Sequence, residues 1–122
     1  MKLSNGLLEN YLTLTAAREK IISSNMANID TPGYRTRDIN FEGELNRAMS
    51  VASFRSSDGT EIPQMLPVVR QIQGLMERPD GNNVSLDREG LEMAETQLRY
   101  ALAIQLLKSD FHDTKAAIAG GS

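Results

Sequence analysis

The segment from Ser23 to Tyr34, with the sequence SSNMANIDTPGY, decides where the first long helix of this chain ends. Pro32 disfavours helical geometry at Thr31 and cannot donate a backbone hydrogen bond, so a helix is not expected to continue through it. Thr31-Pro32-Gly33-Tyr34 fits a type II turn, in which Gly33 supplies the positive φ that the third position needs. We therefore expect the helix to end near residues 28–30 and a turn to follow.

Upstream of this turn, residues 3–29 have the spacing of an amphipathic helix. One stripe with intervals of four and three residues contains the apolar residues Leu8, Leu12, Ile22, Met26 and Ile29. Thr15 and Glu19 fill the intervening positions of this stripe, and Arg18 lies at its margin. A second stripe beside it contains Leu7, Tyr11, Leu14 and Ile21. The pattern predicts a helix that needs a partner along much of its length.

The middle of the chain, residues 30–84, is rich in turn-forming residues, and all four prolines lie between positions 32 and 79. A short helix is expected over Phe41–Met49, with Asn40 as its N-cap. Residues Pro67–Ile72 could form a strand, and Asp58-Gly59 could turn a β-hairpin. The sequence predicts a loop-rich segment between two helices.

Residues 85–118 carry the strongest periodic pattern. A repeat of about 3.5 residues, with Gln97 and Thr114 as its polar members, contains Met93, Tyr100, Ile104, Leu107, Phe111 and Ile118. A flanking stripe contains Leu91, Ala94, Leu98 and Ala101. Ser85 or Asp87 can cap the start, where the acidic Asp87, Glu89 and Glu92 favour the positive end of the helix dipole. Gly120-Gly121 ends the helix.

Composition argues against several classes of function. The chain has 122 residues, a net charge of −3, no cysteine and one histidine, which suits a single domain over residues 1–122. Without a basic cluster we expect no nucleic-acid binding. His112 has no second histidine or cysteine to complete a metal site or a catalytic pair. We expect no enzyme activity, no cofactor, no metal and no small-molecule substrate, and no apolar run is long enough for a secretory signal or a membrane span.

The helix end and turn at residues 23–34 closely resemble the N-terminal signature of the bacterial flagellar rod and hook proteins. The candidate motif and turn residues are Ser24, Asn25, Ala27, Asn28, Asp30, Thr31, Pro32, Gly33 and Tyr34. Within this family the chain is most similar to proximal rod subunits, on the segments Arg35–Phe41, Asp80–Asp87 and Leu98–Tyr100. The resemblance covers residues 5–50 and 78–111.

The resemblance implies a mainly α fold in which the two terminal helices pair as an antiparallel, coiled-coil-like inner domain. It implies a structural subunit that polymerises through these helices into the shaft transmitting motor torque, and that is exported to the basal body in the periplasmic space without a cleaved signal. Its partners would be other copies, other rod proteins, the junction protein between rod and export gate, and the surrounding ring. Candidate packing residues are Leu8, Leu12, Ile22, Met26, Ile29, Met93, Leu98, Tyr100, Ile104, Leu107 and Phe111.

Other functions remain open at this point. The periodicity alone also allows a self-contained helical bundle. Another axial subunit of the rod and hook family has the same architecture, and a helical export adaptor or chaperone would also be rich in amphipathic helices. A small hydrolase has no candidate pair of nucleophile and base. If the chain polymerises, we expect its terminal helices to be largely disordered until assembly, because isolated helices are marginally stable in water.

Overall fold

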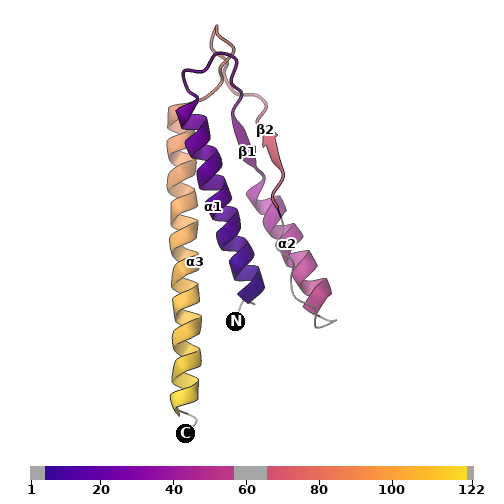
Figure 1. The fold of residues 1–122 in the computed structure, drawn as a ribbon, viewed down its shortest axis with the longest axis vertical. Helices are drawn as coiled ribbons and strands as arrows, with labels where there is room; N and C mark the ends of the chain where they lie inside the picture. The colour runs from indigo at the N-terminus through magenta and orange to yellow at the C-terminus, as the bar shows by residue number, and fades with distance from the viewer. Residues whose placement is uncertain (1–4, 57–65, 121–122) are drawn as a thin grey trace.

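Residues 5–56 and 66–120 are described by the computed structural model of the chain. The elements, in chain order, are α1 (Asn5–Ala27), β1 (Arg37–Ile39), α2 (Phe41–Ser56), β2 (Val69–Gln71) and α3 (Leu86–Gly120). Helices α1 and α3 lie side by side and run in opposite directions, and an arm formed by β1, α2 and β2 lies along the other side of α1 (Figure 1). The predicted mainly α fold with paired terminal helices is confirmed.

The first helix ends as its sequence predicts. The last residue of α1 is Ala27, and the chain then turns through residues 28–33. Gly33 has a φ of 75°, and the amide of Tyr34 donates to the carbonyl oxygen of Thr31 at 3.2 Å. This is the hydrogen bond that closes a four-residue turn, so the predicted turn with a left-handed glycine is confirmed.

The middle of the chain contains a longer helix than the sequence predicts. α2 starts at Phe41, where the side-chain Oδ1 of Asn40 accepts from the amide of Gly43 at 3.2 Å and caps the helix. The helix continues to Ser56 rather than ending at Met49. No proline and no further glycine occurs between Met49 and Ser56, so nothing in the local sequence stops the helix there.

The two strands form a small antiparallel sheet in which α2 separates them in sequence. Arg37 pairs with Gln71, Asp38 with Arg70 and Ile39 with Val69. The strand predicted within residues 67–72 is thus confirmed, and its partner is β1. The tight turn predicted at Asp58-Gly59 lies outside the described residues.

The apolar core is small and lies between α1 and the arm. Its buried members are Leu14, Ile39 and Phe41, with Tyr11 packed against the Phe41 ring edge-to-face at a centroid distance of 5.4 Å. Along the contact between α1 and α3, by contrast, many of the buried side chains are polar: Thr15, Arg18, Asn25, Glu89 and Thr96. Arg18, which periodicity places at the margin of α1, is buried because this surface provides it with carboxylate partners.

The buried residues of α3 also differ from its apolar repeat. Glu89, Thr96 and Ala103, spaced seven residues apart, are buried. Of the predicted stripe, Met93 and Ile104 are half-buried, whereas Tyr100 and Leu107 are exposed, as is Leu98 of the flanking stripe. The side chains of Phe111 and His112 lie outside the described residues. Periodicity locates the apolar face of a helix, but the face that α3 turns toward α1 is largely polar.

Candidate functional site at the polar junction

The most distinctive feature of the chain is a set of polar side chains where the end of α1, the start of β1 and the start of α3 meet. We call it the polar junction, and it consists of Arg18, Asn25, Asp38, Asn82, Asn83, Arg88, Glu89 and Glu92. Arg88 and Glu92 lie at its rim, and the other members are buried. Buried polar groups destabilise a fold unless they are hydrogen-bonded, so the partners of each decide what the junction does.

Asn25 is the centre of the junction. Its Nδ2 donates to the carbonyl oxygen of Arg37 at 2.8 Å and to Oε2 of Glu89 at 2.9 Å. Its Oδ1 accepts from the amide of Arg37 at 3.1 Å and from the hydroxyl of Tyr34 at 2.9 Å. The side chain is fully buried, and all four of its hydrogen-bonding positions are used. One carboxamide therefore connects α1 to β1, to the turn and to α3.

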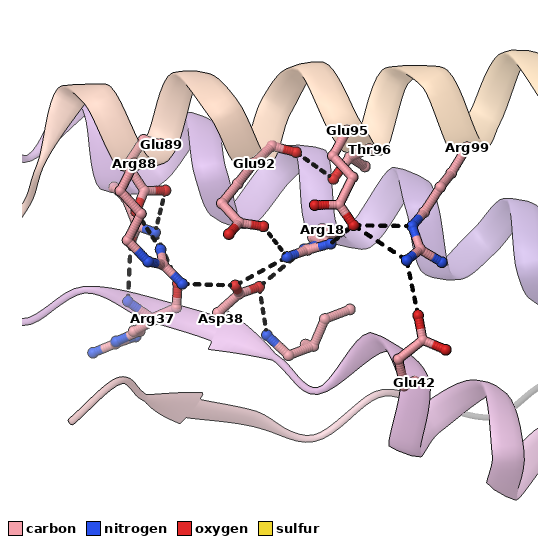
Figure 2. A network of polar contacts seen from close by, with 12 residues as sticks. Arg18, Arg37, Asp38, Glu42, Arg88, Glu89, Glu92, Glu95, Thr96 and Arg99 are labelled. Atoms are coloured by element: carbon pink, nitrogen blue, oxygen red, sulfur yellow. Dashed lines mark hydrogen bonds and ion pairs between the residues drawn. The ribbon is translucent and has the colours of Figure 1, made fainter. Parts of the chain in front are cut away.

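Two arginines from different helices converge on Asp38 of β1 (Figure 2). Arg18 of α1 donates to Asp38 through Nε and Nη2 at 3.3 and 3.4 Å, and Arg88 of α3 donates to Oδ2 of Asp38 at 3.2 Å. Arg18 also donates to Glu92, and Arg88 donates to Oε1 of Glu89 at 2.7 Å. The network joins three elements, because Asp38 receives donors from both helices and Arg18 donates to both β1 and α3.

The carboxylates beside Arg88 favour its charged form. Burial lowers the pKa of Arg88, but the negative charges of Glu89 and Asp38 and the hydrogen bonds to them outweigh burial and raise the pKa above its ordinary value. A basic group whose pKa is raised by folding contributes stability that is lost only as the pH rises through that pKa. A guanidinium keeps its proton in proteins, so Arg88 is a cation in the folded chain.

Arg99 makes a second connection between α3 and the arm. Its Nη2 donates to Oε1 of Glu42 at 2.8 Å, and its guanidinium lies 4.4 Å from the centroid of the Phe41 ring. Burial lowers the pKa of Arg99, but hydrogen bonds to Glu42, Tyr11 and Glu95 raise it above its ordinary value overall. The arm is thus held to the helix pair at two positions along α3. Arg88 binds Asp38 at the first position, and Arg99 contacts the Phe41 ring at the second.

Residues 82 and 83, which lead into α3, complete the polar junction by binding the segment that follows α1. Nδ2 of Asn82 shares its hydrogens among the carbonyl oxygens of Asn28, Ile29 and Thr31 at 2.9–3.0 Å. These three carbonyl oxygens belong to the turn that follows α1, and Asn82 supplies their partner from a distant part of the chain. Oδ1 of Asn83 similarly accepts from the amide of Thr36 at 2.6 Å. The turn after α1 and the residue that precedes β1 are therefore held by side chains of the segment that leads into α3.

Two glycines allow this close approach. The amide of Gly33 donates to the carbonyl oxygen of Asp80 at 2.9 Å. Gly81 has a φ of 86°, and a Cβ atom there would lie 3.4 Å from Cα of Gly33. A side chain at position 81 would thus be strained by its backbone conformation and crowded by the turn.

The motif residues predicted from the sequence make different contacts in the structure. Asn25 and Tyr34 are hydrogen-bonded within the junction, and Asn28, Thr31 and Gly33 form the turn that Asn82 and Asp80 bind. The carbonyl oxygen of Ser24 accepts from Nδ2 of Asn28 at 2.8 Å. The remaining motif residues, Ala27, Asp30 and Pro32, are exposed.

Most members of the polar junction are not evident from the sequence. Asn82 and Asn83 belong to a segment similar to the family, but the sequence alone indicates no role for them. Glu89 lies in the first turn of α3, as the sequence predicts, but its burial and its hydrogen bonds from Asn25 and Arg88 are not evident from the sequence. A usable signal is the pair of adjacent asparagines after a Pro-Asp-Gly turn, since asparagine side chains often cap neighbouring backbone groups.

The junction has the chemistry of a structural joint. In the described parts of the chain, no group of three or more His, Cys, Asp and Glu residues is arranged to hold a metal ion. No helix within residues 5–56 and 66–120 is long and apolar enough to cross a membrane. Apart from Nδ2 of Asn83, which is buried without a hydrogen-bond partner among the described residues, the polar groups of the junction bind one another and the backbone. The arrangement therefore fixes the relative positions of α1, α3 and the arm.

The sequence comparisons identify this chain, with its paired terminal helices and its attached turn and arm, as a rod protein of the flagellar basal body. A sequence model described as "Flagella basal body rod protein" matches residues 11–35, which include the second half of α1 and the turn. The chain is 32% identical to the flagellar basal body rod protein FlgB of Salmonella typhimurium over 126 residues, which cover 93% of the chain and 91% of that protein. It is 29% identical to FlgB of Bacillus subtilis over 119 residues, with 93% and 92% covered.

A third relative, FlgB of Cereibacter sphaeroides, is 33% identical over 120 residues, with 94% of this chain and 93% of that protein covered. The chain belongs to the FlgB family of flagellar basal body rod proteins. The prediction of a structural subunit of the proximal rod is confirmed by this membership.

Proposed function

We propose that this chain builds the rod by docking the outer face of α3 onto neighbouring subunits. The observation that carries the proposal is the distribution of apolar side chains on α3. The inner face of this helix binds α1 through the polar junction, whereas its large leucines are exposed, with Leu91 at 70% and Leu98 at 61%. Leu102 and Leu106 are exposed on the same side of the helix, and Leu86, Tyr100 and Leu107 are exposed outside this stripe.

An exposed apolar surface of this kind favours association. Contiguous apolar patches on a protein surface commonly mark interaction sites. Burial of each leucine contributes roughly 1.5–3 kcal/mol, so a few of them suffice for a stable contact. A contact between different faces of identical or similar subunits, repeated without closing a ring, produces a helical shaft. Such a shaft can transmit torque, because the polar junction holds each helix pair and its arm as one unit.

The other predicted packing residues have a smaller part in this proposal. Leu8 and Ile22 are buried within the chain, and Leu12, Met26 and Ile29 are half-buried. They support the helix pair from inside and offer little surface to a neighbour. Met93 and Ile104 are half-buried as well, so Leu98, Tyr100 and Leu107 are the predicted residues most open to another subunit.

The family also suggests partners and location. We expect contacts with other copies, other rod proteins, the junction protein between rod and export gate, and the surrounding ring, in the periplasmic part of the basal body. We expect export without a cleaved signal and a structural role without enzyme activity. The exposed apolar face of α3 supports these expectations, since it fits an assembly component.

The test is a pair of substitutions on the outer face, Leu98→Asp and Leu102→Asp, which lie one helical turn apart. Both residues are exposed, so the free energy of unfolding of the chain should change by no more than about 0.5 kcal/mol. Both variants should be lost from purified basal bodies, because a charge in a buried apolar contact is strongly unfavourable. Gln97→Asp, an exposed polar position of the same helix, is the control and should be retained. Wild-type levels of either leucine variant in basal bodies would contradict the proposal.

A further inference from the structure

The two edges of the β1–β2 sheet differ in whether a side chain hydrogen-bonds to their backbone. On the β1 edge, the carboxamide of Asn25 bonds both the amide and the carbonyl oxygen of Arg37, as the peptide group of a third strand would. On the β2 edge, all three residues are exposed. Within the described residues, no side chain hydrogen-bonds to the backbone of β2 as Asn25 does to the backbone of β1.

The pairing pattern shows which backbone groups are free. The amide of Ile72 donates to the carbonyl oxygen of Thr36 at 2.9 Å, so the groups of residues 70 and 72 point toward β1. In an antiparallel ladder the intervening residues point the opposite way. The N–H and C=O groups of Val69 and Gln71 therefore face outward, at the two-residue spacing that another extended strand needs.

The side chains around this edge define what can bind there. Val68, Val69 and Leu66 are exposed apolar residues beside or within β2. Arg70 and Arg37 are exposed on the two strands, and neither guanidinium has a carboxylate partner in the described structure. Of the features that usually block strand addition, β2 contains no proline and no bulge, although it is only three residues long and carries the charged Arg70. The edge thus offers backbone hydrogen bonds, apolar contact and unpaired positive charge.

We propose that the outer edge of β2 receives an extended acidic segment of another basal-body protein, which adds as a third strand. The main-chain groups of Val69 and Gln71 would bind its backbone, and Arg70 would pair with a carboxylate on the added strand. A second copy of β2 fits less well. Pairing two outer edges is two-fold symmetric and closes a dimer, and the register that joins Val69 to Gln71 places two Arg70 side chains opposite each other.

This inference rests on the proposed function, because the partner is met in the assembled basal body. The first test is Gln71→Pro, which removes an N–H that only an added strand would use and leaves the Ile72–Thr36 bond intact. The purified variant should melt like the wild-type chain and show a several-fold lower incorporation into basal bodies. Gln71→Thr keeps the N–H and should incorporate normally. Normal incorporation of a folded Gln71→Pro chain would overturn the inference.

The second test does not depend on the folding of the proline variant. A photo-crosslinking amino acid is placed at Gln71 and, as a control, at Asn46, an exposed residue of α2, in cells that assemble basal bodies. The expected adduct at position 71 is a segment of another basal-body protein that contains Asp or Glu. An adduct with β2 of a second copy, or none above the Asn46 control, would overturn the inference alone. Absence of the wild-type chain from basal bodies would overturn the proposed function and, with it, the inference.

Discussion

At the scale of single residues, Asn25 decides how the turn, the strand and the last helix meet. Its carboxamide has two donors and two acceptor sites, and each one has a partner within 3.1 Å. Aspartate has nearly the same shape but offers no donor when ionised. A substitution that replaces the donors of this side chain by a negative charge and keeps its shape therefore tests the junction with little change in packing.

We expect Asn25→Asp to destabilise the chain by on the order of 3–5 kcal/mol, because it places a second carboxylate against Glu89 and against the carbonyl oxygen of Arg37. The measurement is urea unfolding followed by circular dichroism. Asn46→Asp makes the same chemical change at an exposed position of α2 and should alter stability by less than about 0.5 kcal/mol. Equal stability of the two variants would show that the junction contributes little.

At the scale of elements, the contact of α1 with α3 is unusual in using buried polar pairs where a coiled coil uses leucines. Arg18 on α1 meets Glu92 on α3, and Asn25 meets Glu89. Apolar side chains can slide past one another by a turn with a modest loss of contact, whereas hydrogen-bonded pairs match in one alignment only. We infer that these pairs fix the register of the two helices as well as their stability.

A double-mutant cycle with Arg18→Met and Glu92→Met measures this pairing. Arg18→Met alone should destabilise the chain by about 3–5 kcal/mol, because Asp38 and Glu92 each lose a buried partner. The coupling energy of the cycle should be about 1–3 kcal/mol. The pair Arg35 and Glu77, which is more exposed than Arg18 and Glu92, is the reference and should couple by less than about 1 kcal/mol. Similar coupling energies for the two pairs would contradict a special role of the buried pair.

Sequence patterns predict the elements well and the junction poorly, for a physical reason. The end of α1, the turn at Gly33 and the start of α3 follow from local chemistry, namely proline, a positive φ and a capping serine whose Oγ accepts from the amide of Arg88 at 3.3 Å. Burial of Arg18 and Glu89 follows from partners 20 to 74 positions away, which no local pattern contains. The motif residues are recognisable only because they resemble a known family.

At the scale of the molecule, α3 is longer than the helix it pairs with. It has 35 residues and α1 has 23, a difference of about 18 Å at 1.5 Å per residue. The last turns of α3 extend past the start of α1 (Figure 1). The polar junction lies at the opposite end of the pair, so these turns gain no support from it. The expected disorder of the free chain is therefore concentrated in this extension.

Hydrogen exchange can measure this difference. In a dilute solution of the free chain, backbone amides of residues 107–119 should exchange at close to the rate of an unfolded peptide, because an isolated helix of this length is marginal. Amides of residues 92–104, which lie beside α1, should be protected. In assembled rods both segments should be protected, since neighbouring subunits cover the extension. Strong protection of residues 107–119 in the dilute chain would contradict this expectation.

The hydrogen bonds that Asn82 makes to the turn after α1 also set an order of events in time. The carbonyl oxygens of Asn28, Ile29 and Thr31 receive their partner from a residue more than 50 positions later in the chain. A chain that emerges N-terminus first presents α1 and the turn long before Asn82 arrives. The turn therefore lacks these hydrogen bonds until two-thirds of the chain has passed, and the docking of α1 waits for the segment that leads into α3.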